Sequence, residues 1–229
     1  MIMLERKPVA AILIFFCLAF APANEARAQS QNFDISSGGQ PTITGALNGS
    51  VSGSSSPTQN LTVTIDFGEV SALNTNSLVK VVVPVAVRSA QPYQVTVSLS
   101  GTANADARAL QFSDIGFGAN NMRILGSKAQ ICTNGSHVFR TPFGGDPSTG
   151  ATINSAGRVA YRSSLASISS GSTIILSGPK LTQGTSITRR EDDGWVFDVI
   201  LVITPQFFSA GTTGATLTFS ISSGPNVQC

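Results

Sequence analysis

The stretch LTVTIDFGEV, residues 61–70, decides the fold. Apolar and polar residues alternate strictly from Leu61 to Phe67, and the pattern breaks at Gly68. The apolar positions are Leu61, Val63, Ile65 and Phe67. An apolar side chain at every second position predicts a β-strand with one face on a core and one face in water.

Further segments of the same kind follow along the chain. Two of them alternate like the first, Tyr93–Leu99 and Ala215–Ile221, whereas Val79–Val87 and Val196–Ile203 are apolar on both faces and predict central strands. Shorter candidates are Met122–Leu125 and Thr173–Leu176. Pro84 interrupts one apolar run and predicts a bulge or an edge there, because proline cannot donate a ladder hydrogen bond.

Helical patterns are scarce. Asp106–Phe112 is the one modest helical segment, and glycine-containing turn pairs separate many short strands. This pattern predicts an all-β protein, an antiparallel β-sandwich with long loops and little helix.

The N-terminus carries the pattern of a secretory signal peptide. Arg6 and Lys7 precede an apolar run from Val9 to Phe20, and Ala26-Arg27-Ala28 follows as a small-residue cleavage site. The alternative is an N-terminal membrane anchor, but the apolar run is shorter than the roughly 20 residues that a span needs. We therefore expect a secreted protein, located in the periplasm, at the cell surface or outside the cell, with no transmembrane segment once residues 1–28 are removed.

The remaining chain divides into an arm and a body. Residues 29–60 are rich in Gly, Ser, Thr and Asn and predict a flexible N-terminal arm. Residues 61–229 predict the β-sandwich domain, in which 101–190 is an irregular, loop-rich middle that includes GFGANN at 116–121 as a loop. The alternative for the middle is a second, small β-subdomain.

Charge argues against a nucleic-acid partner. Cleavage after Ala28 removes three of the 14 basic and two of the 12 acidic residues, which leaves 11 and 10. Binding to phosphates requires a clustered basic face. The densest basic pair, Arg189-Arg190, is followed at once by three acidic residues.

Two cysteines remain after cleavage, Cys132 and Cys229. In an oxidising compartment they predict one disulfide between the middle of the chain and its C-terminus. The alternatives are two free thiols or pairing of Cys229 between chains.

No residue set points to catalysis or to a cofactor. His137 is the only histidine and lies near a turn, where a surface position is expected rather than a Ser-His-Asp site. The carboxylates single out no catalytic pair, and the acidic run Glu191–Asp193 lacks the residue order of a calcium loop. We expect no enzyme, no cofactor and no metal site.

The only tryptophan, Trp195, suggests a second class of function. A secreted carbohydrate-binding module would stack sugars on Trp195, Tyr93 or Tyr161. Trp195 directly precedes an apolar run, so burial in the core or at the end of a sheet is the competing expectation.

Three segments together resemble bacterial pilin-like and spore-coat-U-like secreted domains. They are IDFGEV (65–70), SAQPYQVTVSLSG (89–101) and FSAGTTGATLTFSIS (208–222). The resemblance implies an immunoglobulin-like sandwich with a groove that is filled by a β-strand from a neighbouring subunit or from a periplasmic chaperone. Such strand addition takes its affinity from backbone hydrogen bonds and its specificity from alternate side chains.

The N-terminal arm is then the candidate donor strand. Phe33 and Ile35, or Ile43, Gly45 and Leu47, have the required period of two. The leading hypothesis is an exported structural or adhesive surface protein, pilus-subunit-like or coat-like, whose partners are itself or related subunits.

Overall fold

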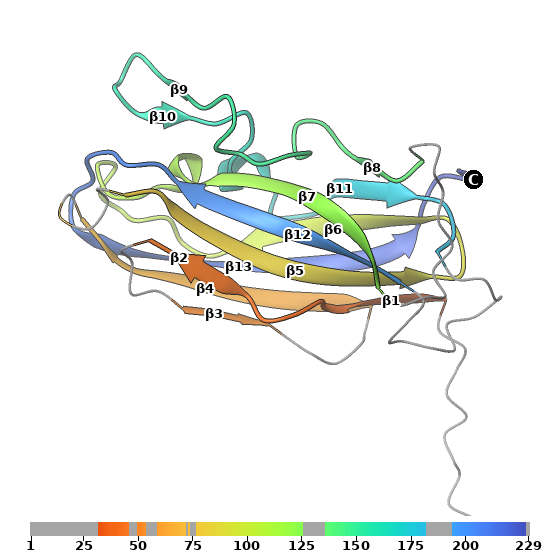
Figure 1. The fold of residues 1–229 in the computed structure, drawn as a ribbon. Helices are drawn as coiled ribbons and strands as arrows, with labels where there is room; N and C mark the ends of the chain where they lie inside the picture. The colour runs from red at the N-terminus through yellow and green to blue at the C-terminus, as the bar shows by residue number, and fades with distance from the viewer. Residues whose placement is uncertain are drawn as a thin grey trace, which may run out of the picture.

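Two antiparallel sheets packed face to face form the protein in its computed structural model (Figure 1). The structure describes residues 32–45, 50–53, 59–71, 73, 77–125, 136–181 and 194–227. The predicted signal peptide, Leu47, Cys132, Cys229 and Glu191–Asp193 lie outside the described residues.

The first sheet has the strand order β1-β5-β12-β7, and β2 also pairs with β5. Its strands are β1 (Phe33–Ser37), β2 (Thr42–Thr44), β5 (Val79–Ser89), β7 (Gly116–Leu125) and β12 (Gly194–Ile203). The two segments that are apolar on both faces, β5 and β12, are central strands, as the sequence predicts.

The second sheet has the order β3-β4-β13-β6-β11-β8. Its strands are β3 (Ser50–Gly53), β4 (Asn60–Val70), β6 (Tyr93–Ser100), β8 (Val138–Phe139), β11 (Thr173–Gly178) and β13 (Gly211–Ser223). A separate hairpin joins β9 (Thr152–Ile153) to β10 (Val159–Ala160), and two short 3-10 helices, η1 (Phe112–Asp114) and η2 (Leu165–Ser167), complete the described elements. The predicted all-β antiparallel sandwich is confirmed.

Strand β4 shows how the alternating pattern builds the core. Leu61, Val63 and Ile65 are buried against the other sheet, while the threonines between them are exposed. The strand does not end at Gly68. Between Asp66 and Glu69 it carries one more residue than its partner β13, and Gly68 adopts a φ of 68°, so the strand bulges and continues to Val70.

The glycines of GFGANN lie in strand β7, so the prediction of a loop at 116–121 is wrong. Phe117 and Ala119 face the core, and the alternate positions 116 and 118 face an overlying segment. A Cβ atom at Gly118 would collide with the carbonyl oxygen of Gly145, and one at Gly116 would lie 2.7 Å from the Tyr161 ring. Glycine marks the close approach of a second chain segment here, a recognised role of glycine in strands.

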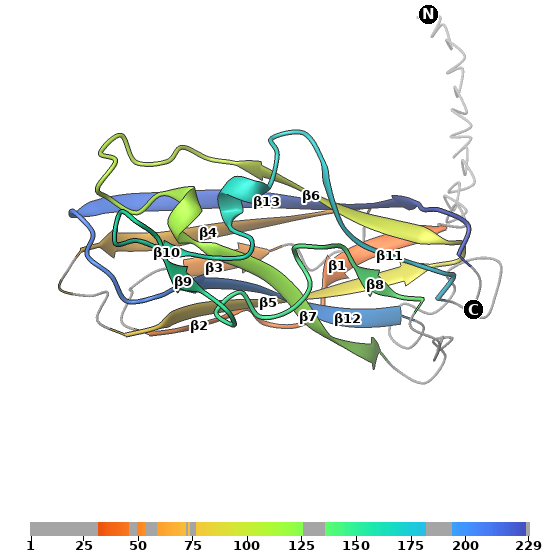
Figure 2. The same cartoon turned by 90° about the horizontal axis from the view of Figure 1, so that it is seen from above.

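That overlying segment, residues 136–172, closes one side of the sandwich (Figure 2). It starts in the second sheet with β8, whose neighbour Arg140 donates its N–H to Ile175 O. It then follows the outer edge of β7, where Ala119 N donates to Phe143 O at 2.8 Å and Gly145 N donates to Ala119 O at 2.9 Å. At Phe117 and Ala119 the edge of β7 is therefore paired within the chain and is not free for another strand.

The predicted helix at Asp106–Phe112 is also absent, and turns replace it before η1. The Asn104 side chain accepts a hydrogen bond from Asp106 N at 3.0 Å, and the Asp106 side chain accepts one from Arg108 N at 2.8 Å. Such local bonds offer the backbone an alternative to the helix.

Candidate functional site

Strand β1 adds the N-terminal segment to the edge of the first sheet. It pairs antiparallel with β5, with Phe33 opposite Ser89, Ile35 opposite Val87 and Ser37 opposite Val85. Ile35 is fully buried, Phe33 packs against the same core cluster, and β1 also contacts β4 and β13 of the facing sheet. Residues 33–44, expected within a loose arm, are therefore built into the sandwich.

Strand β2 pairs with the same edge of β5, after residues 38–41 that belong to neither strand. Ile43 lies opposite Val81 and is partly buried against the core. Ile43 and the pair Phe33 and Ile35 thus occupy one strand-binding site on β5, whereas Leu47 lies outside the described residues.

Pro84 explains why the edge is divided into two strands. β1 leaves β5 opposite Val85, and β2 joins it opposite Val82. The Pro84 carbonyl accepts a hydrogen bond from Gly38 N at 2.8 Å, so Pro84 presents its hydrogen-bonding side to this edge, where its nitrogen has no hydrogen to donate. The irregularity predicted at Pro84 therefore occurs as the break between β1 and β2, whereas β5 itself pairs with β12 through Pro84 without a shift of register.

A buried ion pair joins β1 to β5. Arg88 Nη1 donates to Asp34 Oδ2 at 2.9 Å, and the two side chains are 7% and 0% exposed. Arg88 also donates to Ser36 Oγ at 3.3 Å. Asp34 and Arg88 are direct cross-strand partners, so the charges meet only in this register.

The neighbouring strand leaves room for this arginine. Gly194 lies at the start of β12, where a Cβ atom would stand 2.6 Å from Arg88 Cγ. The pair is not predicted from the sequence, because Asp34 and Arg88 are 54 positions apart and no local pattern joins them. The available signal was an aspartate within the alternating FDIS of residues 33–36.

The three aromatic residues considered for sugar binding form no exposed platform. Trp195 is buried beside His137, with ring centroids 4.7 Å apart. The Tyr93 hydroxyl lies 3.1 Å from His137 Nδ1, and the Tyr161 hydroxyl accepts a hydrogen bond from Thr204 N at 2.8 Å. The expectation that Trp195 is buried agrees with this geometry.

His137 lies between aromatic rings and is not the surface residue that the sequence suggested. Burial lowers its pKa from 6.5 to about 4 and raises the pKa of Tyr93 above its usual value. A Cβ atom at Gly178 would collide with the imidazole ring, so only glycine lets β11 pass this close to His137. The ring is therefore neutral at physiological pH and serves the packing of this end of the sandwich.

We expect the stability of the protein to decrease as the pH falls from about 6.5 to about 4. In this window the unfolded histidine binds a proton that the folded His137 does not bind, so protonation favours the unfolded state. Denaturant unfolding at several pH values measures the effect, and His137→Gln is the control because His137 is the only histidine. Parallel pH profiles for the two proteins would contradict this assignment.

The described carboxylates are distributed among separate structural contacts. Asp146 pairs with Lys80 at 2.6 Å, and Asp198 pairs with Arg123 at 2.9 Å. Asp66 accepts a hydrogen bond from Gly68 N at 2.8 Å. In the part of the chain that the structure describes, no three His, Cys, Asp or Glu residues are grouped as metal ligands.

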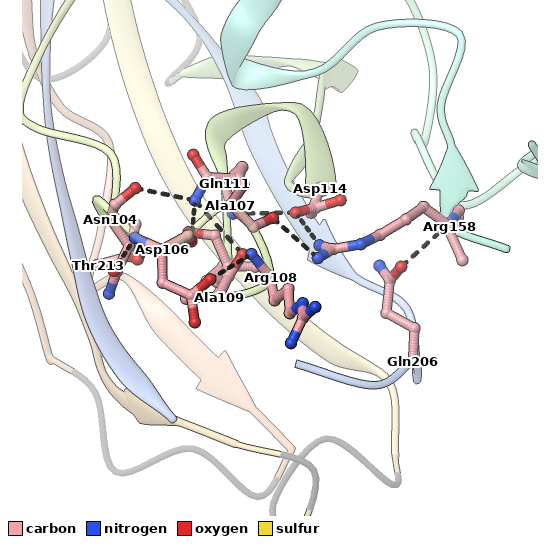
Figure 3. A network of polar contacts seen from close by, with 12 residues as sticks. Asn104, Asp106, Ala107, Arg108, Ala109, Gln111, Asp114, Arg158, Gln206 and Thr213 are labelled. Atoms are coloured by element: carbon pink, nitrogen blue, oxygen red, sulfur yellow. Dashed lines mark hydrogen bonds and ion pairs between the residues drawn. The ribbon is translucent and has the colours of Figure 1, made fainter. Parts of the chain in front are cut away.

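A polar network braces the loops at one end of the sandwich (Figure 3). Arg158 donates to Asp114 at 2.6 Å and to Ala107 O at 3.1 Å, and Gln111 N donates to Asp114 at 2.9 Å. Burial raises the pKa of Asp114, even though the Gln111 amide and the Arg158 guanidinium favour its charged form. The network ties η1 to the strand β10.

Beside this network lies a shallow hollow of about 270 Å³. It is lined by Arg108, Arg158, Phe207, Phe208 and Ser209. Phe208 is buried beneath the Arg158 guanidinium, which lies 5.3 Å from its ring centroid, whereas Phe207 is 87% exposed. Sequence reasoning singled out none of these residues, because an isolated phenylalanine in a turn carries no distinctive pattern.

Comparison with protein-family models, with curated proteins and with solved structures found no significant match. Within the described ranges, no helix is both long and apolar enough to cross a membrane.

Proposed function

We propose that the protein is an exported structural or adhesive surface subunit, pilus-subunit-like or coat-like, that assembles by β-strand addition. In the assembly, segment 33–44 of one copy lies along β5 of the next copy. The observation that carries this proposal is the position of β1 and β2, which are the first described strands of the chain and form the edge of the first sheet.

The site has both parts that strand addition requires. The antiparallel ladder with β5 supplies backbone hydrogen bonds. Phe33 and Ile35, two positions apart, supply the alternate apolar side chains that pack on the core. Complete burial of an isoleucine side chain contributes about 1.5–3 kcal/mol. A strand from another copy would make the same contacts as the strand of the chain itself.

The topology suits an exchange of β1 and β2 between copies. β2 pairs with β5 in the first sheet, whereas β3, the next described strand, pairs with β4 in the second. Exchange of an identical element between protomers keeps every strand pair and changes only which chain supplies the element.

The test is the mass of the protein after refolding at high concentration, measured by size-exclusion chromatography with light scattering. We expect multimers of the full chain. A Ser36→Cys/Ala86→Cys variant, with the new cysteines at directly paired positions, should stay monomeric when oxidised before concentration and should form multimers when reduced.

The single variant Ala86→Cys is the matched control, because it keeps the Ser36 hydroxyl that contacts Arg88, and it should behave as the unmodified chain. A full chain that remains monomeric after refolding, with no difference between the locked and reduced double variant, would overturn strand addition.

A further inference from the structure

The buried ion pair between Asp34 and Arg88 affects which strands can pair with the edge of β5. Asp34 is completely buried, and Arg88 is almost so. Separating two such charges is much more costly than separating an exposed pair, because the group left behind stays in a medium of low polarity. A strand that presents a carboxylate opposite Arg88 keeps this buried contact, and a strand without one loses it.

The N-terminal segment can meet this requirement in one register only. Asp34 is its only acidic residue between positions 29 and 44. A shift by two residues would bring Asn32 or Ser36 opposite Arg88, and a shift by one residue would turn Asp34 towards the apolar core. Of these registers, only the observed one both points Ile35 into the core and forms the ion pair.

We infer that the Asp34–Arg88 pair is the specificity determinant of the strand site, and that it selects segment 33–37 of a second copy of this chain. This inference rests on the proposed strand addition and adds the chemistry of the partner. The accepted strand carries an apolar residue, an acidic residue, a second apolar residue and a small hydroxyl residue in sequence, as FDIS does at 33–36. The hydroxyl of Ser36 extends the recognition, since it accepts a second bond from Arg88.

A charge exchange between copies tests this inference. Asp34→Arg and Arg88→Asp are prepared as separate full-length variants with different affinity tags, and each is refolded alone and together with the other. Alone, each variant places like charges opposite each other at every site. In the mixture, a donor strand of either variant meets an opposite charge in the groove of the other variant.

We expect the mixture to assemble into alternating multimers, while each variant alone assembles on the order of 100-fold less well, as breaking a buried pair implies. Sequential purification on the two tags, followed by light scattering, measures the mixed species. The double variant Asp34→Arg/Arg88→Asp restores opposite charges and should assemble by itself.

Folding failure of the single variants is controlled by Asp34→Asn, which keeps the shape of the side chain. In a refolded mixture of unmodified and Asp34→Asn chains, the unmodified donor strands should occupy at least about ten times more β5 edges than the Asp34→Asn donor strands do. Equal use of both donors, or assembly of each charge variant alone as well as the mixture, would overturn the inference. Strand addition itself would survive that result, because the unmodified chain would still form multimers that the Ser36–Ala86 lock prevents.

Discussion

Phe197→Ala is expected to lower the free energy of unfolding by about 3–5 kcal/mol. Phe197 lies in β12 and is fully buried, and its ring meets the Phe139 ring edge-on at a centroid distance of 5.8 Å. Truncation removes this buried surface and leaves a cavity between two sheets that cannot collapse onto each other locally. Denaturant unfolding followed by circular dichroism measures the loss.

Phe207→Ala is the matched control for this substitution. The same atoms are removed from a side chain that is 87% exposed, so the free energy of unfolding should change by no more than about 0.5 kcal/mol. Similar losses for Phe197→Ala and Phe207→Ala would contradict the position of the core between the two sheets.

Ile35→Ala is expected to cost about 2–5 kcal/mol. Ile35 is fully buried at the sheet edge and belongs to the same core cluster as Val87 of β5 and Val63 of β4. The loss should appear in the single cooperative transition of the whole domain, because β1 pairs with β5 in its own sheet and contacts β4 and β13 of the facing sheet. Chemical denaturation at low protein concentration measures it in the monomer.

Ile153→Ala provides the comparison for Ile35→Ala. Ile153 lies in the β9–β10 hairpin and is 69% exposed, so its truncation should leave stability nearly unchanged. If Ile35→Ala were equally silent, residues 33–37 would not belong to the folded body, and the proposed strand site would lose its basis.

The sandwich itself can be predicted from local sequence patterns. In β4, β6 and β13 every second side chain is apolar, and each of these strands buries that set against the facing sheet. The unbroken apolar runs of β5 and β12 place both strands inside their sheet. These features can be predicted because the two-residue period of a strand depends only on neighbouring residues.

Other features depend on residues that are distant in the sequence. Gly116 and Gly118 suggest a loop until the segment around Gly145 and Tyr161 is placed against them. Trp195 could face a ligand or the core, and only the position of His137 shows that it is enclosed. In both cases the identity of the contacting segment is set by how the chain returns to the sheet, which no local period encodes.

The sequence by itself determined that this chain forms an antiparallel β-sandwich, and it identified the period of two at Phe33 and Ile35. Only the tertiary structure decided that these residues fill the edge of β5, and that Asp34 meets Arg88 there in a buried ion pair. The physical reason is the separation in sequence between the residues that determine each feature. Alternation is a property of adjacent residues, whereas the buried pair forms only when two residues 54 positions apart in the chain are brought to hydrogen-bonding distance.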